Sequence, residues 1–237
     1  PSITAIEEFY SKHYVPQNMA ICISGDIDPD KTFEIIKKHF SSWGNPTPLR
    51  EEPKWEEAPL AGREFVQVQY LGEEQVLMAF RTAPRFHQDY PALRLVDMIL
   101  DNSVAGLINL NLVNQQKVRA AGCFSLNYND YGAHFLMGSP KDDQTLEDVE
   151  KLLLEQIEQV KNGEFEDWIL PAVINDFKKR QKEDLESNAK RVELMRDAYL
   201  AFVDWDVMNG QIAQLEKVSK DDIVRVANKY YGNDYVV

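Results

Sequence analysis

The sequence is poor in sulfur, in imidazole and in positive charge. It contains two cysteines and four histidines among 237 residues. Cys22 and Cys123 lie in apolar stretches without a C-x-x-C neighbour, so we expect free, buried thiols and neither a disulfide framework nor a zinc knuckle. With 39 acidic and 26 basic residues the formal charge is −13, which opposes binding to nucleic acid or anionic lipid and favours a cationic or neutral partner.

Long apolar runs are also missing. Even residues 92–100 are interrupted by Arg94 and Asp97, so no segment approaches the roughly 18 apolar residues of a membrane span. We therefore expect a soluble protein, for which a bacterial cytoplasm and a periplasm both stay open. The chain begins with Pro1 and Ser2 instead of Met, which suggests a processed protein or a piece of a longer one.

The spacing of apolar residues predicts alternating blocks of strands and helices. The apolar content of 44% is enough for a buried core. Two strands flank Gly72 and are expected to form a hairpin. The order favours an α+β fold, with a mostly antiparallel sheet and helices packed on one face. Strands are predicted over residues 19–24, 63–71, 75–83, 119–130 and 131–139, and helices over 2–14, 28–44, 89–100, 104–116 and most of 145–231, with a break at 162–163 and a last helix from 219.

The two ends of the chain resemble each other. Ser2, Ile6 and the pair His13-Tyr14 recur 217 positions later as Ser219, Ile223 and the pair Tyr230-Tyr231. Chance similarity of two amphipathic helices is the alternative. Taken as a repeat, the pattern predicts the helix-strand-helix tail of one unit over residues 1–45, a linker rich in Pro and Glu over 46–62, and a second unit over 63–237.

Three aspartates at alternating positions resemble the start of a calcium-binding loop. Asp26, Asp28 and Asp30 match its first three ligand positions, but Lys31 stands where the loop needs Gly and Lys37 where it needs Glu. Two lysines in the cage would repel calcium. The sequence instead predicts that Asp28 or Asp30 caps the helix beginning at Pro29.

The histidines form no zinc motif. His13, His39, His87 and His134 are not spaced as H-E-x-x-H or H-x-x-E-H. A metal-dependent hydrolase built on His87, Asp89 and His134 is the least favoured interpretation, since a polar loop residue followed by a helix cap explains His87 and Asp89 more simply. The residues alone predict no catalytic and no metal-binding side chain. Five aromatic residues line either a peptide groove or, as we prefer, the core: Trp168, Tyr199, Trp205, Tyr230 and Tyr231.

Four segments together resemble the pitrilysin/insulinase family of zinc peptidases, the inverzincins. The first is "FYSKHYVPQNMAICISGDIDPDKTFEIIKKHF", in which a helix, Y-x-P-x-N-M, an apolar strand, G-D-x-D and another helix follow one another. The others are "FRTAPRFHQDYPALRLVDMIL", "YGAHFLMGSPKDDQTLEDVEKLLLEQIEQVKNGEFED" and "VSKDDIVRVANKYYGNDYVV". The resemblance covers the whole chain and is weakest in the linker.

The resemblance implies a non-catalytic domain of a larger zinc metallopeptidase. The family's H-x-x-E-H motif, which holds zinc and activates water, is absent here. Zinc is therefore expected in the parent protein's catalytic domain and no cofactor in this segment. The implied partners are homologous domains of the parent chain and peptide substrates. A structural or assembly subunit that shares the fold is the alternative.

Some non-catalytic units of this family hold substrate through an Arg and a Tyr about seven residues apart. The matching region, "NLVNQQKVRAAG", offers Leu112 or Val113 at the Arg position and Arg119 or Ala120 at the Tyr position. Neither role carries over to this chain. The sequence thus predicts no residue in direct contact with the reacting peptide and favours an enclosing or packing role.

Overall fold

The computed structural model of the protein describes residues 1–44, 56–102 and 105–237. These residues divide into two compact units. Unit 1 comprises residues 1–57 and 182–208, and unit 2 comprises residues 58–181 and 209–237. Most of the predicted linker, residues 46–55, lies outside the described residues, and residues 56–62 contain no helix or strand.

Unit 1 contains helices whose starts follow the sequence closely. α1 spans Ile3–His13 and begins at Ser2, whose side chain accepts a hydrogen bond from the backbone of Ala5. α2 spans Pro29–Phe40, and the Asp28 carboxylate caps it by accepting from the backbone of Lys31. The capping interpretation of the aspartates is therefore confirmed for Asp28. A single 3-10 turn, η1 (Pro16–Asn18), and α6 (Asn188–Leu200) complete the helices that lie wholly within unit 1.

The strand predicted over residues 19–24 is not formed. These residues have no ladder partner among the strands that the structure describes. The composition of an apolar run can predict a strand, but a strand forms only where the backbone makes hydrogen bonds to a neighbouring strand. The sequence pattern therefore identified an apolar segment without the partner that would pair with it.

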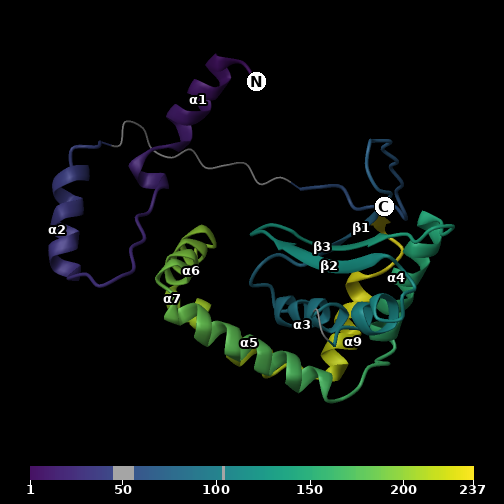
Figure 1. Ribbon diagram of the computed structural model, residues 1–237. Helices are drawn as coiled ribbons and strands as arrows, with labels where there is room; N and C mark the ends of the chain where they lie inside the picture. The colour runs from purple at the N-terminus through teal and green to yellow at the C-terminus, as the bar shows by residue number, and fades with distance from the viewer. Residues whose placement is uncertain (45–55, 103–104) are drawn as a thin grey trace. The chain divides into compact units, whose positions relative to one another are not determined.

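Unit 2 is built on a four-stranded antiparallel sheet. Its strands are β1 (Val76–Thr82), β2 (Ala120–Asn127), β3 (Gly132–Ser139) and β4 (Tyr235–Val236), in the order β2-β3-β1-β4. β3 pairs with both β2 and β1 over their full lengths. Figure 1 shows β2 and β3 side by side. The predicted α+β fold with an antiparallel sheet is confirmed.

The predicted hairpin around Gly72 is wrong. β1 pairs with β3 on one side and, at Ala79 and Phe80, with β4 on the other, and residues 63–71 form no ladder with it. Residues 64–66 instead run parallel to β4, and the Glu64 amide donates to the carbonyl of Tyr235 at 2.9 Å. The partner of residues 64–66 is therefore β4, from the far end of the chain. Turn residues such as Gly72 predict only pairing between neighbouring segments.

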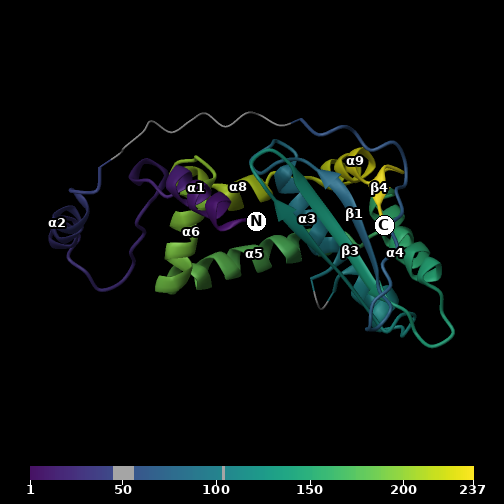
Figure 2. The same ribbon diagram turned by 90° about the horizontal axis from the view of Figure 1, so that it is seen from above.

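Helices cover one face of this sheet. α3 (Tyr90–Leu100), α4 (Leu146–Lys161) and α9 (Lys220–Tyr230) pack against it and against one another (Figures 1 and 2). Alternate residues of β1 and β3 point into this layer, as the two-residue period of a strand requires. The core includes Met78, Phe80, Leu95, Ile99, Leu136, Leu153 and Ile223.

The remaining helices are short or lead away from the sheet. The helix predicted over 104–116 is reduced to the π-helix η2 (Asn109–Val113) and the residues just before it. The predicted break after α4 is confirmed at Gly163, whose positive φ of 69° suits glycine. The other helices are α5 (Ile169–Glu186), α7 (Trp205–Asn209) and α8 (Gln211–Leu215).

The predicted similarity of the two ends is visible in backbone geometry. α1 and α9 both have 11 residues, both follow a serine cap, and their bounds differ by 217 positions. Both end at a tyrosine in the same unusual backbone conformation, with φ −91°, ψ 66° at Tyr14 and φ −108°, ψ 58° at Tyr231. Burial separates them, because α9 buries Ile223, Val226 and Ala227 whereas α1 buries no residue.

Candidate functional site

The three residues of the least favoured hydrolase interpretation do not meet at one site. His87 and Asp89 lie in the turn before α3, where Nδ1 of His87 accepts from the backbone of Asp89 at 3.1 Å. His134 lies on β3 and contacts Asp97 and Tyr231. The one group of three potential metal ligands within the described residues includes His134 but neither His87 nor Asp89.

Asp89 connects α3 to α9. It stands at the start of α3, as predicted, but its side chain makes no capping hydrogen bond. Its carboxylate is 1% exposed and accepts from Arg225 at 2.9 Å, Lys229 at 2.7 Å and Tyr230 at 2.9 Å. Burial raises the pKa of Asp89, but the hydrogen bonds from Lys229, Arg225 and Tyr230 together outweigh it and lower the pKa to about 2. Asp89 is therefore an ionised structural anchor.

Glu150 forms a second anchor. Its carboxylate accepts two hydrogen bonds from the Arg63 guanidinium, both at 2.7 Å, and one from the Tyr235 hydroxyl at 2.7 Å. The bonds from Arg63 lower the pKa of Glu150 and outweigh the opposing effect of its burial. This network attaches Arg63 and the Tyr235 residue of β4 to Glu150 on α4. The buried charge of Glu150 is thus explained by its structural role.

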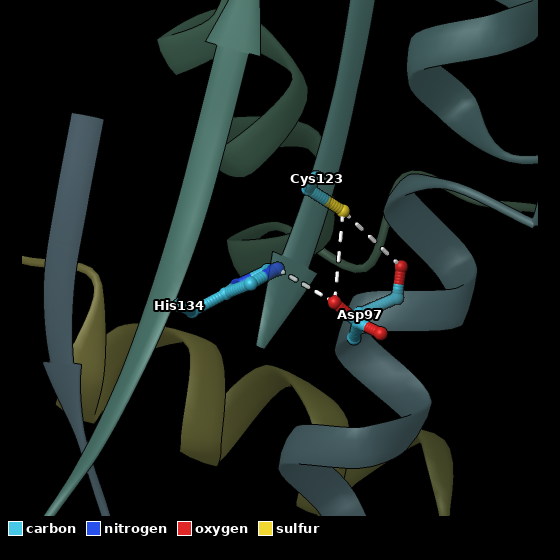
Figure 3. A group of neighbouring side chains, drawn as sticks. All are labelled: Asp97, Cys123 and His134. Carbon is cyan, nitrogen blue, oxygen red and sulfur yellow. Dashed lines mark hydrogen bonds and ion pairs between the residues drawn. The ribbon is translucent and has the colours of Figure 1, made fainter. Parts of the chain in front are cut away.

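Asp97, Cys123 and His134 form the group of potential ligands. Figure 3 shows Cys123 on β2 and His134 on β3 both pointing toward Asp97 on α3. His134 Nε2 lies 2.9 Å from Asp97 Oδ1, and Cys123 Sγ lies 3.8 Å from the same oxygen. Three elements supply one residue each. Residues from three separate elements have no fixed spacing in the sequence, so motifs for metal sites do not indicate this group.

The region that matches the family's Arg and Tyr positions carries no comparable pair. Leu112 is fully buried, and Val113 packs against the core. Arg119 lies on the surface, where it pairs with Glu73 and Asp142. The structure therefore agrees with the sequence, which lacks the family's Arg and Tyr in this region.

The aromatic residues divide between core and surface. Tyr231 is buried in the core, as predicted, and Tyr230 donates its hydroxyl hydrogen bond to Asp89. The core prediction is wrong for Trp168, Tyr199 and Trp205, which are 54%, 39% and 37% exposed. Helical spacing could not separate these cases, because it fixes the face of a helix and not what covers that face.

The sheet face opposite the helices is apolar and partly open. Leu77, Phe124 and Leu126 are 47%, 38% and 39% exposed, although each lies in a strand. The ring of Phe124 stacks on that of Phe135 of the neighbouring strand, with centroids 4.9 Å apart. Adjacent Met137 continues this surface, because it pairs with Leu77 in the register of β1 and β3. We call these five residues the open face.

β2 forms the edge of the sheet next to the open face. Among the described strands it pairs only with β3. Its edge is interrupted at Cys123, whose backbone amide donates to Asp101 Oδ2 at 3.2 Å. Gly122 permits this approach, since a Cβ there would lie 2.8 Å from the same oxygen. This edge of β2 thus pairs with no further strand among the described residues, and one side chain blocks part of it.

Comparison with known proteins identifies relatives of the chain. The family described as "Peptidase M16 inactive domain" matches residues 2–177. The chain is 29% identical over 238 residues to the zinc protease PqqE of Helicobacter pylori, a match that covers 95% of this chain and 52% of that protein. The chain therefore spans about half the length of this curated relative.

Solved structures share the fold. A protease from Helicobacter pylori superimposes with a TM-score of 0.92 at 22% identity, over 100% of this chain and 58% of that one. The M16 inactive domain from Pseudomonas fluorescens does so with a TM-score of 0.80 at 16% identity, over 100% and 57% of the two chains. The predicted resemblance to the pitrilysin/insulinase zinc peptidases is confirmed, and the chain belongs to the M16 peptidase family, of which it carries the inactive domain.

Proposed function

We propose that the chain is the non-catalytic part of a larger zinc metallopeptidase and that it helps to enclose and bind peptide substrates. The open face is the observation that carries this proposal. Its exposed leucines and phenylalanine in regular strands offer apolar contact to an extended peptide, and the adjoining edge of β2 offers backbone groups for strand addition. The charge of −13 favours neutral or cationic peptides.

The chemical step belongs to another part of the parent protein. An H-x-x-E-H motif is absent from this sequence, and such a motif is what supplies zinc ligands and a general base in this class of peptidase. We place the zinc of the parent in a homologous catalytic domain, with residues 1–45 as the tail of that domain, 46–62 as a linker and 63–237 as the inactive domain. The homologous domains are then the chain's first partners.

Peptide binding to the purified chain tests this proposal. We expect a labelled, unstructured cationic peptide to bind, as measured by fluorescence anisotropy, and the double variant F124S/L126S to bind at least about tenfold more weakly, because each buried leucine or phenylalanine contributes roughly 1.5–3 kcal/mol. F202S is the matched control, since Phe202 is 88% exposed and belongs to unit 1. Equal binding by all three proteins would exclude the open face as the binding surface.

The second candidate function is that of a structural or assembly subunit without a role in proteolysis. The two charged anchors at Asp89 and Glu150 support it, because each connects distant elements of unit 2 to one another. If neither neutral nor cationic peptides bind the chain at all, this second function replaces the first. An upstream H-x-x-E-H in the parent reading frame would support the first.

A further inference from the structure

The group of Asp97, Cys123 and His134 has the composition of a transition-metal site. It offers one carboxylate oxygen, one thiol sulfur and one imidazole nitrogen, and these donor atoms all lie within 4.8 Å of one another. Mixed nitrogen, sulfur and oxygen donors suit Zn²⁺, whereas Mg²⁺ and Ca²⁺ take oxygen ligands. The side chains converge from α3, β2 and β3 (Figure 3).

The imidazole of His134 has one nitrogen that faces a carboxylate. The side chain is 1% exposed, and Nε2 lies 2.9 Å from Asp97 Oδ1 without the alignment of a hydrogen bond. Asp97 Oδ1 also accepts from the Ser125 hydroxyl at 3.2 Å. The other nitrogen, Nδ1, lies 2.6 Å from the Tyr231 hydroxyl, which fixes the ring so that Nε2 faces the carboxylate. Metal-binding histidines are oriented in the same way by a partner on their second nitrogen.

The surroundings of the thiol are negative. Cys123 Sγ lies 3.5 Å from the backbone oxygen of Asp97 and 3.8 Å from Asp97 Oδ1, and the Cys123 amide donates to Asp101 Oδ2 at 3.2 Å. A divalent cation between Sγ and Oδ1 would be attracted by these oxygens, and the thiol would release its proton to solvent when it becomes a ligand.

We propose that Asp97, Cys123 and His134 bind a Zn²⁺ ion that connects α3 to the sheet. With zinc bonds of about 2.0–2.3 Å, donor atoms on a tetrahedral ion lie roughly 3.3–3.6 Å apart. Sγ and Oδ1, at 3.8 Å, already approach this spacing, and Nε2 must move from Oδ1 by a few tenths of an ångström. Nε2 and Sγ lie within 4.8 Å of each other and must approach by at most about 1.2 Å. A water molecule takes the fourth position. This site departs from the expectation, drawn from the sequence, that the segment holds no metal.

The ion would have a structural role and would not be a centre of peptide hydrolysis. His134 is buried beneath the sheet, and Asp97 serves as a ligand, so this group leaves no carboxylate of its own to act as general base. The proposal does not depend on the proposed function, because a structural zinc would fit an enclosing domain and an assembly subunit equally well.

Zinc binding by the reduced, full 237-residue chain tests the site. We expect one Zn²⁺ per chain after dialysis, measured by elemental analysis, and a competition titration against a chelator in which C123S and D97N each bind at least about tenfold more weakly. C22S is the matched control, because Cys22 is the other free cysteine and lies in unit 1. Circular dichroism establishes that each variant is folded. If C123S does not fold, the zinc affinity of D97N tests the site in its place.

Cobalt and thermal unfolding give independent readouts. Co²⁺ should produce a thiolate-to-metal charge-transfer band in wild type and C22S that is absent in C123S. Zinc should raise the Tm of the wild type by a few degrees, and a chelator should reverse this. The proposal is overturned if zinc binds wild type and C123S equally, if no saturable binding occurs, or if Co²⁺ binds without the thiolate band.

Discussion

Asp89 and Lys229 are separated by 140 positions in the chain, yet Asp89 Oδ2 and Lys229 Nζ lie 2.7 Å apart. Their contact joins the start of α3 to the end of α9, two helices that pack against each other beside the sheet. The buried carboxylate receives further hydrogen bonds from Arg225 and Tyr230. A single side chain thus holds two helices in place.

Replacing Asp89 by Asn should lower the free energy of unfolding at neutral pH by about 1–2 kcal/mol, since the substitution removes the charge that pairs with Arg225 and Lys229. The half-exposed state of both basic partners keeps this figure modest. Urea unfolding measures it. D130N, at an exposed carboxylate, is the control and should change stability by less than about 0.5 kcal/mol.

The stability contributed by Asp89 should disappear in acid. Its pKa is lowered from 3.8 to about 2 in the folded chain, so the unfolded state binds the proton first as the pH falls. The contribution is complete above the unfolded value and is lost as the pH decreases toward 2. The difference between wild type and D89N should therefore shrink over that range. A difference that stays constant down to pH 2 would contradict the assignment.

Replacing Glu150 by Gln should loosen the edge of the sheet formed by β4. The Gln amide keeps one acceptor oxygen, but it removes the negative charge and the second acceptor that Arg63 uses, which costs about 1–3 kcal/mol. Amide hydrogen exchange should accelerate at Val66 and Val237, which bond across this edge, and stay unchanged between β2 and β3. E155Q, on the exposed side of α4, should leave all these rates unaltered.

The serine caps of the two similar helices should differ in their importance. Ser219 forms a capping box with Asp222 at the start of α9, so S219A should destabilise unit 2 by about 1 kcal/mol. Ser2 caps α1, which buries no residue, so S2A should change global unfolding little. Urea unfolding followed by far-UV circular dichroism compares the two. Equal effects would show that α1 is packed as tightly as α9.

The isolated chain should not cleave peptides, with or without added Zn²⁺. Its histidines are distributed over separate elements, and in the group around His134 the only carboxylate, Asp97, is itself a potential ligand, so no general base is left to activate a water molecule. Quenched fluorescent peptides measure this directly. Turnover that requires zinc, stops with a chelator and is lost in C123S would contradict the prediction.

Local signals in the sequence predicted much of the fold. Caps at Ser2, Asp28 and Ser219 and the glycine at 163 set helix limits that the structure reproduces, because each acts within a few residues. Alternation of apolar residues likewise identified β1, β2 and β3. Local signals did not predict which strands pair with each other. The hairpin predicted at Gly72 was wrong because β4, from the far end of the chain, pairs with β1.

The candidate sites depend on contacts between distant elements. The sequence predicted a helix cap at Asp89, whereas in the structure its carboxylate accepts hydrogen bonds from three side chains of α9. The sequence predicted a free, buried thiol at Cys123 and a strand residue at His134 that faces solvent or a satisfied partner, and the spacing of neither residue indicated Asp97 on α3. Only the register of β2 and β3 and the packing of α3 bring these residues together.

The parallel pairing of residues 64–66 with β4 has a consequence for biosynthesis. β4 lies between β1 and this segment, so both must wait for residues that the ribosome releases long after them. Throughout that interval the nascent chain exposes a strand edge that in the mature protein is covered. Such late closure favours slow folding and leaves this edge open to wrong pairing until β4 is inserted.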